Sequence, residues 1–457
     1  MLIGGNFCAL GARVAALAMM FCTLVCGFAS ARPNVVVKGL SSNDASGPPD
    51  YNYCTRNFGE PCYSPQQIRT AYGLNGLIDA GMVGAGQTII LIESYGSPTI
   101  AADLEAFDAG YGLPAPPSLT VLAPLGSVPW DPNTYPLQPG WGYETTLDVE
   151  WAHAMAPGAA IVVLTSPVAE TEGVQGLPEF LQLEKYALDN HLGQIVSQSW
   201  AATENTLFDA AGREVIANYS AFYARAVTEH VTVLAAAGDT GSSSYSNAAG
   251  TKYYPFPTVN FPASSPLVTA VGGTALNLEP SGKYLFETVW NDAGCCAGGG
   301  GISQVFAEPG YQQTSLPESV QEQLGGMRGM PDVSYNAAVD NDFIWVYVSF
   351  PGSGGPGWAG IGGTSEGSPQ WAGIIADLNQ YAGKPLGFLN PALYALGGAG
   401  LFGSFGRDIT AGDNQLRYVP GAVAPGYAAT RGWDPASGWG TPNLVELPSQ
   451  ALPLLDH

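Results

Sequence analysis

Apolar and polar positions alternate along the chain with two different periods from residue 64 onward. Short apolar runs that resemble buried strands are separated by longer stretches in which apolar residues recur every three to four positions. We predict strands at 88–92, 161–164, 194–197, 231–235 and 267–271, and helices near 100–111, 143–155, 177–190, 208–229 and 368–381. Buried strands that alternate with helices are typical of a largely parallel sheet with helices on both faces, so the pattern predicts an α/β fold.

The segment before this alternation has the features of an export signal. Arg13 is followed by an apolar run at 14–29 and then by Ala29-Ser30-Ala31, a combination typical of a cleavable signal peptide. The run is short for a membrane anchor of about 20 residues, and no later stretch is long and apolar enough to span a membrane. We expect a signal peptide at 1–31, an extended segment without a long prosegment at 32–62, and one folded domain at 63–457.

The charge of the chain limits its partners. There are 38 Asp and Glu residues against 15 Lys and Arg residues, which gives a net charge of −23 at pH 7. This balance argues against nucleic acids and anionic membranes as partners. It fits an acidic habitat, where many carboxylates are protonated, and it equally fits an ordinary soluble exported protein.

Four of the seven cysteines lie after the expected signal peptide. Cys54 and Cys62 could close a small loop in an oxidising compartment. Cys295 and Cys296 could pair with each other or elsewhere, and the sequence leaves this connectivity open. No CxxC pair with a second ligand pair exists, so a structural zinc site is not expected.

Ser365 is the candidate nucleophile. It lies in Gly362-Gly363-Thr364-Ser365-Glu366-Gly367-Ser368-Pro369, next to the last predicted helix. Glycines permit a sharp turn, and we expect Pro369 in the first helical turn, where its missing N–H costs nothing. A serine held there is close to a helix N-terminus, which favours developing negative charge. The alternative is that Thr364, Ser365 or Ser368 merely caps the helix.

Carboxylates are better placed than histidines to act as the base that a nucleophilic serine needs. In the predicted helix 143–155, Glu144 and Asp148 lie one turn apart on the same face. Two adjacent carboxylates can share a proton, so one can accept the serine proton while the other orients it. His153 would point to the opposite side of this helix. The alternative is a solvated acidic face, although Leu147 and Val149 indicate a packed helix.

Asp239 is the third candidate, in Gly238-Asp239-Thr240-Gly241 directly after the predicted strand 231–235. Catalytic groups of open parallel sheets gather beyond the carboxyl ends of strands, which is where Asp239 falls. There it could be a protonated acid that donates a hydrogen bond to a tetrahedral oxyanion. The alternative is a turn residue that bonds its own backbone.

Taken in order, these motifs resemble those of the sedolisin family, the kumamolisin-like serine-carboxyl peptidases. The resemblance covers roughly residues 64–443. Its further motifs are Tyr63-Ser64-Pro65, Ile68-Arg69-Thr70-Ala71-Tyr72, Ala156-Pro157-Gly158-Ala159, Phe261-Pro262-Ala263, Val271-Gly272-Gly273-Thr274 and Pro331-Asp332-Val333-Ser334. The resemblance implies a subtilisin-like fold in which the subtilisin histidine is replaced.

The resemblance also implies roles for individual residues. Ser365 would be the nucleophile, Glu144 the general base and acid, Asp148 its partner, and Asp239 the oxyanion-hole acid. Glu93 and Trp200 resemble a supporting hydrogen-bond network. One calcium ion would be bound in a C-terminal loop by the carboxylates of Asp408 and Asp434 and the backbone carbonyls of Ile409, Thr430 and Gly432, since calcium prefers oxygen donors.

Two features depart from the family pattern. Only about 30 residues separate Ala31 from Ser64, where family members usually carry a long prosegment. Glu366 follows the nucleophile where small or apolar residues are more common, and it could shift the titration of the site or simply face solvent.

The predicted function is therefore a secreted serine-carboxyl endopeptidase that acts on proteins or peptides in acid, as a monomer. A histidine-dependent subtilisin is disfavoured because no His-Gly-Thr segment occurs, and an aspartic protease because Asp239-Thr240-Gly241 is a single instance of a motif needed twice. A non-catalytic secreted binding protein on a peptidase fold is the remaining alternative.

Overall fold

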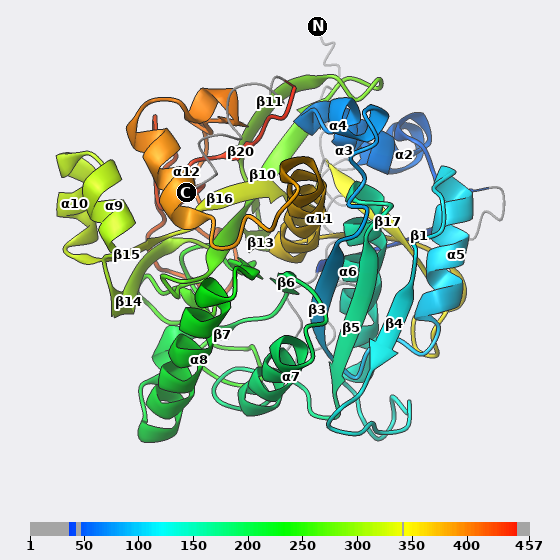
Figure 1. The fold of residues 1–457 in the computed structure, drawn as a ribbon, viewed down its shortest axis with the longest axis horizontal. Helices are drawn as coiled ribbons and strands as arrows, with labels where there is room; N and C mark the ends of the chain where they lie inside the picture. Colours follow the sequence, from blue (N-terminus) through cyan, green and yellow to red (C-terminus); the bar gives the residue numbers. More distant parts are fainter. Residues whose placement is uncertain (1–35, 43–46, 341, 446–457) are drawn as a thin grey trace, which may run out of the picture.

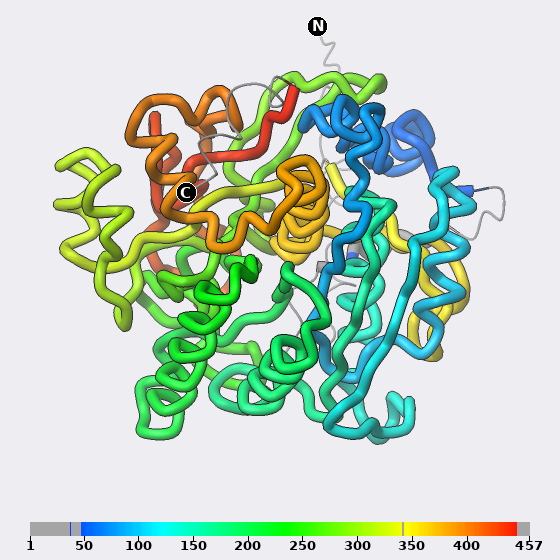
Figure 2. The backbone as a smooth tube through the Cα atoms, in the orientation of Figure 1, coloured from blue at the N-terminus to red at the C-terminus, as the bar shows by residue number. Residues whose placement is uncertain are grey.

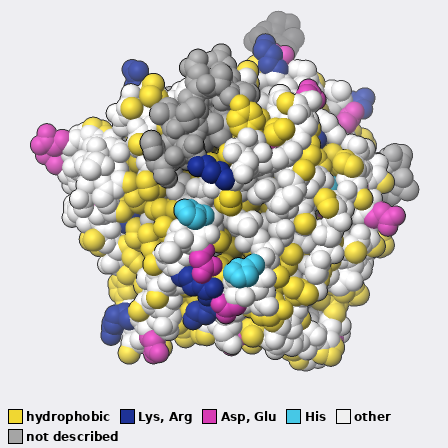
Figure 3. All heavy atoms as spheres, viewed as in Figure 1, with side chains coloured by type: hydrophobic (Ala, Val, Ile, Leu, Met, Phe, Trp, Pro, Cys, Tyr) yellow, Lys and Arg dark blue, Asp and Glu magenta, His cyan; other side chains and the backbone are white. Residues whose placement is uncertain are grey.

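The computed structural model describes residues 36–42, 47–340 and 342–445. The predicted signal peptide lies outside these residues. Within them, no helix has both the length and the apolar character that crossing a bilayer requires. The face of the molecule seen in Figure 3 carries few charged side chains among many polar and apolar ones.

The largest sheet has eight strands and is mainly parallel, which confirms the predicted α/β fold (Figure 1). Its order is β11 (Tyr284–Val289), β10 (Thr269–Leu278), β8 (Thr232–Ala236), β6 (Ile195–Gln198), β3 (Thr88–Ser94), β5 (Ala160–Ser166) and β4 (Leu119–Leu122), with β16 (Val333–Asn336) also paired to β10. Every pairing in this sheet is parallel except that of β10 with β11. The carboxyl ends of β3, β6 and β8 therefore meet at one edge.

The central strand β3 is buried on both faces because alternate residues enter two different cores. Ile89 and Leu91 belong to the core that contains α6 (Gln138–Met155) and α11 (Thr364–Ala382). Ile90 and Ile92 belong to the core that contains α7 (Leu177–Asp189) and α8 (Ala210–Thr228). A continuous apolar run is what a strand covered by helices on both sides requires.

A second sheet covers the far side of α6. It has the order β1 (Val36–Ser42), β18 (Gly357–Gly362), β17 (Phe343–Val348) and β2 (Cys62–Tyr63). Where the sequence predicts an extended segment at 32–62, the structure also contains the helix α2 (Tyr51–Phe58). A disulfide joins Cys54 of this helix to Cys62 of β2.

The predicted helix boundaries agree closely with the structure, except at the start of two helices. The helix α5 (Ile100–Tyr111) has the predicted bounds, and α7 and α8 differ from theirs by at most two residues at either end. The helix α6 begins at Gln138, before the predicted start at Tyr143. The helix α11 begins at Thr364 rather than at Ser368, so the expectation that Pro369 occupies the first turn is wrong. Because α11 starts earlier, Ser365 lies in its first turn.

Candidate active site

Ser365 is held between a strand and a helix. The strand β18 ends at Gly362 and α11 begins at Thr364, so Gly363 alone makes the turn. Gly363 has φ of 116°, a conformation that residues with a Cβ avoid, and its N–H donates to the carbonyl oxygen of Ala337 at 2.7 Å. Ser365 is fully buried in the first turn of α11, where the positive end of the helix dipole favours negative charge.

The helix α6 presents Glu144 and Asp148 to this serine. The two helices pack side by side over the sheet, although they are far apart in the sequence (Figure 2). Gly373 of α11 lets them approach, because a Cβ at this position would lie 2.6 Å from the Cβ of Met155. Glu144 and Asp148 are both fully buried, so the alternative of a solvated acidic face is wrong.

The pKa of Glu144 depends on the three other candidate residues, Asp148, Ser365 and Asp239. Burial and the nearby carboxyl of Asp148 raise its pKa well above the ordinary value, the Ser365 hydroxyl lowers it, and Asp239 raises it further. Buried carboxyl groups hold their protons because the charged form loses its hydration. The Ser365 hydroxyl is thus close enough to affect the Glu144 carboxyl, but neither Glu144 oxygen makes a hydrogen bond of ordinary geometry within the described part of the chain.

Asp148 is the member of the group that most readily holds a negative charge. Burial raises its pKa to about 7, but hydrogen bonds from Ser199 and Glu93 oppose this rise. The Ser199 Oγ donates to the Asp148 Oδ1 at 2.8 Å. Glu93, at the carboxyl end of β3, is also fully buried, and its pKa is raised well above the ordinary value by burial, Asp148 and Glu144. A bond between two carboxyls needs one proton, which therefore belongs to Glu93.

The expected contribution of Trp200 to this network is absent. Glu93 accepts a hydrogen bond from Thr145 at 3.3 Å and is bonded to Asp148. The indole nitrogen of Trp200 has no hydrogen-bond partner among the described residues. Its ring instead packs at 4.9 Å from Phe180, in the core on the opposite face of the sheet.

Asp239 approaches the site from the loop after β8. Its Oδ1 accepts two hydrogen bonds from Thr364, one from the backbone N–H and one from the hydroxyl, both at 2.8 Å. Its Oδ2 is buried and has no hydrogen-bond partner among the described residues. Burial raises the pKa of Asp239 to about 7, while the two bonds from Thr364 act in the opposite direction. A carboxyl in this setting is protonated in mild acid.

The histidine of α6 is directed away from the candidate site. His153 is buried, with its Nε2 at 3.2 Å from the Asp108 Oδ1 and 2.8 Å from the Pro114 carbonyl oxygen. Asp108 belongs to α5, which packs on the opposite side of α6 from α11 (Figure 1). This confirms the prediction that His153 does not face Ser365.

Glu366 is buried, so the possibility that it faces solvent is wrong. Its Oε1 accepts hydrogen bonds from the side-chain amides of Asn336 at 3.1 Å and Gln370 at 3.2 Å. Burial raises its pKa well above the ordinary value. Glu366 is therefore a neutral group in acid that packs α11 against β16.

The predicted calcium ligands lie together at a C-terminal loop. The Asp408 Oδ2 accepts from the Gly432 N–H at 2.8 Å, and the Asp434 Oδ2 accepts from the Thr430 N–H at 2.7 Å. No donor to the carbonyl oxygens of Ile409, Thr430 or Gly432 is found within the described part of the chain. Two carboxylates and three available carbonyls fit the donor set of calcium. Clusters of three or more acidic, His or Cys side chains suited to a metal do not occur among the described residues.

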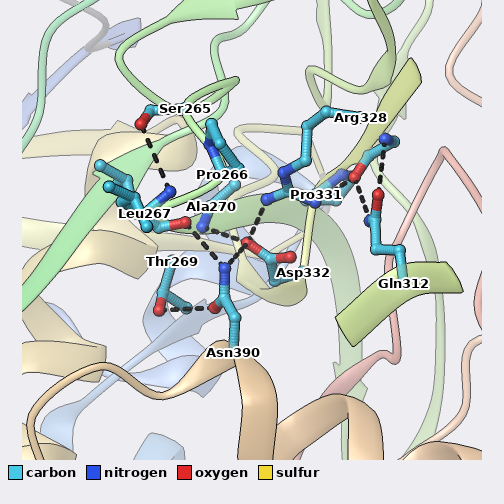
Figure 4. A network of polar contacts seen from close by, with 12 residues as sticks. Ser265, Pro266, Leu267, Thr269, Ala270, Gln312, Arg328, Pro331, Asp332 and Asn390 are labelled. Atoms are coloured by element: carbon cyan, nitrogen blue, oxygen red, sulfur yellow. Dashed lines mark hydrogen bonds and ion pairs between the residues drawn. The ribbon is translucent and has the colours of Figure 1, made fainter. Parts of the chain in front are cut away.

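A buried polar network supports this loop and connects it to α11. Arg328 and Asp332, both fully buried, form an ion pair at 2.6 Å that Asn390 and the Ala270 N–H complete (Figure 4). The backbone of Asp332 is also bonded to the chain that follows the predicted calcium loop, because the Trp439 N–H donates to the Asp332 carbonyl oxygen at 2.9 Å.

Ser334 extends the connection toward the nucleophile. Its hydroxyl donates to the carbonyl oxygen of Ser437, and its own carbonyl oxygen accepts from the Trp371 indole of α11 at 3.1 Å. Ser334 thereby links the loop to the helix that carries Ser365.

The structure also settles the second disulfide. Cys295 and Cys296 are bonded to each other, one of the two possibilities that the sequence leaves open. The bond lies next to the Asp239 loop, because the N–H of Ala297 donates to the carbonyl oxygen of Asp239 at 3.0 Å.

Comparisons with known proteins identify relatives over most of the chain. It is 35% identical over 398 residues to kumamolisin from Bacillus sp. (strain MN-32), an alignment that covers 86% of this chain and 64% of kumamolisin. It is 31% identical over 322 residues to tripeptidyl-peptidase 1 from Homo sapiens, which covers 67% of this chain and 51% of that protein. The chain thus spans between half and two thirds of the length of these relatives. No protein-family model matches it.

A solved structure agrees with these relatives. The fold resembles that of Pseudomonas sedolisin (serine-carboxyl proteinase), solved in complex with two molecules of pseudo-iodotyrostatin, with a TM-score of 0.68 and 26% sequence identity. The match covers 85% of this chain and 98% of the sedolisin chain. The similarity therefore extends over the central sheet and the helices that carry the candidate site.

Proposed function

The chain belongs to the sedolisin family, and from this membership we propose that it is a serine-carboxyl endopeptidase that hydrolyses proteins or peptides in acid. The observation that supports the proposal is the position of buried Ser365 close to Glu144, which lies in a group of buried carboxyls and is influenced by Asp239. None of the described histidines is in that group. The signal-like N-terminus supports secretion, and we propose that the folded domain at 63–457 acts as a monomer.

In the proposed mechanism, Ser365 attacks the peptide carbonyl while Glu144 accepts the hydroxyl proton. Glu93, Glu144 and Asp148 share a single negative charge. Glu144 can accept the serine proton when this charge lies on Glu144 and not on Asp148. Asp239, in its neutral form, donates a hydrogen bond to the tetrahedral oxyanion. Glu144 then returns the proton to the leaving amine, and water hydrolyses the acyl-enzyme by the same steps in reverse.

Opposite protonation requirements set the pH range of this mechanism. The group of Glu93, Glu144 and Asp148 must have lost one proton, whereas Asp239 must keep its own. Because the pKa of Asp239 is raised only to about 7, the oxyanion donor is lost as the pH rises through this value. We expect kcat/KM on an unstructured protein substrate to fall as the pH rises above about 7, because Asp239 then loses the proton that it donates to the oxyanion. Full activity at alkaline pH would count against the proposal.

We further propose that Asp408, Asp434 and the carbonyls of Ile409, Thr430 and Gly432 hold one calcium ion. A bound calcium ion would neutralise the two carboxylates and fix the loop that Ser334 connects to α11. A ligand that binds only the folded state at 1,000 times its Kd stabilises that state by about 4 kcal/mol.

Chelation of calcium is accordingly expected to lower the Tm by several degrees, and calcium to restore it. The measurement is calorimetry with and without EDTA on the Ser365→Ala variant, which cannot digest itself. Asp408→Asn is the matched control, since its Tm should no longer respond to EDTA. An unchanged Tm in the parent variant after chelation would remove the calcium proposal.

A further inference from the structure

Thr364 makes both hydrogen bonds that the Asp239 carboxyl receives from the described residues. Its N–H and its hydroxyl both donate to the same oxygen, Oδ1, at 2.8 Å. Its hydroxyl oxygen in turn accepts from the N–H of Gly238 at 2.9 Å. The sequence suggests only a helix cap for this residue, yet no side-chain cap is formed at the start of α11. Thr364 is fully buried, so its rotamer is fixed by packing.

The direction of these bonds determines which oxygen of Asp239 can carry a proton. An oxygen that already accepts two hydrogen bonds is a poor site for a proton, because a proton there would point at a donor. The Thr364 hydroxyl has a single hydrogen, which it directs to Oδ1 while its oxygen accepts the Gly238 N–H. The proton of the neutral carboxyl is therefore left on Oδ2, which is buried and has no hydrogen-bond partner among the residues that the structure describes.

The backbone around Asp239 keeps this arrangement rigid. Gly238 has φ of 104°, and a Cβ there would lie 2.1 Å from the side-chain nitrogen of Asn260. The carbonyl oxygens of Gly238 and Asp239 accept from the N–H groups of Gly299 at 2.7 Å and Ala297 at 3.0 Å. The carboxyl of Asp239 thus has its main chain fixed on one side and its Oδ1 fixed on the other.

We propose that Thr364 is a positioning residue that locks Oδ1 of Asp239 as an acceptor and so directs the Oδ2 proton to the oxyanion. This inference rests on the proposed function, because it assumes that Asp239 is the oxyanion acid. Thr364 lies next to Ser365 in the sequence, so the nucleophile and the residue that orients the oxyanion donor move together with the first turn of α11. Any displacement of this turn would disturb both groups at once.

The test compares Thr364→Val, which removes the hydroxyl at nearly constant shape, with Thr364→Ser, which keeps it. We expect Thr364→Val to lower kcat by about 10- to 100-fold with little change in KM, since one preorganised donor is misaligned. We also expect the alkaline limb of its pH profile to move to higher pH, because a hydrogen bond that favours ionised Asp239 is lost. Thr364→Ser should restore both properties to within about threefold of the wild type.

The direction of the pH shift separates positioning from a general loss of structure. Glu144 is the other titratable group coupled to Asp239, and neither Thr364 variant changes it. A packing defect alone would lower activity without moving the alkaline limb upward. The inference would be overturned if Thr364→Val kept the kcat and the alkaline limb of the pH profile of the wild type. It would also be overturned if Thr364→Ser behaved like Thr364→Val.

Asp239→Asn provides a second test that holds even if Thr364→Val does not fold. Only one orientation of the Asn amide lets its oxygen accept from Thr364, and that orientation places the NH₂ group where the Oδ2 proton was. We expect the Asp239→Asn enzyme to be measurably active in acid, and its pH–activity profile to lack the fall near pH 7. Activity as low as that of Ser365→Ala would overturn the inference. An inactive wild type would instead contradict the proposed function itself, which keeps the two failures distinguishable.

Discussion

Replacement of Ser365 with alanine is expected to lower kcat by about 10⁶-fold, the size of the loss when the nucleophile of a serine peptidase is removed. The loss is large because the variant can form no acyl-enzyme. Peptide hydrolysis would then depend on a water molecule that the site does not hold in place. The measurement is the rate of cleavage of an unstructured protein at the acid optimum, with the folded state of the variant checked by circular dichroism.

Ser368→Ala is the matched control for this prediction. Ser368 lies one turn further along α11 and is also fully buried, with its Oγ at 2.8 Å from the Ser197 Oγ. Its loss should cost about 1 kcal/mol of stability and less than about tenfold in activity. Comparable activity of Ser365→Ala and the wild type would contradict the assignment of the nucleophile.

Replacement of Glu144 with glutamine is expected to lower kcat by about 10³-fold while KM changes little. The amide keeps the size of the side chain and can still bond to the Ser365 hydroxyl, but it cannot take up the proton. General base catalysis contributes about 10²- to 10⁴-fold in enzymes, and here the base acts in both acylation and deacylation. Steady-state kinetics across the acid range measures the effect.

Glu150→Gln controls for the loss of a buried carboxyl from the same helix. Glu150 is fully buried, and its Oε2 accepts from the Tyr347 N–H at 3.0 Å on the side of α6 that faces β17. Burial raises its pKa well above the ordinary value, so it is neutral in acid and an amide should replace it with less than about threefold loss. Equal losses in Glu144→Gln and Glu150→Gln would show that Glu144 has only a structural role.

The sequence was sufficient to predict the α/β fold and the helices that carry the site because their signals are local. An apolar run identifies β3, and a helical period identifies α6, on which the spacing of Glu144 and Asp148 requires that they share a face. Ser365 could be identified in the same way, from glycines that precede a helix. These features depend on residues close together in the chain.

Features that depend on contacts between distant segments could not be predicted in this way. The bonds from Thr364 to Asp239 join residues 125 positions apart, and nothing local to either residue indicates them. The burial of Glu366 depends on β16 and its neighbours, in a glycine-rich region where the periodicity is weak. The position of Glu93 at the end of a predicted strand was enough to suggest that it supports the site. The place of Trp200 in a different core, in contrast, follows only from the packing of α7 and α8.

Capture of the acyl-enzyme is the most direct test of the claim that Ser365 is activated by a carboxyl group. The enzyme is mixed with an activated peptide ester at the acid optimum, quenched in strong acid within the first turnover, digested with pepsin and examined by mass spectrometry. We expect an acyl group on the peptide that contains Ser365, formed about 10³-fold more slowly in Glu144→Gln. An acyl group on another residue, or equal rates of acylation in the two enzymes, would contradict that claim.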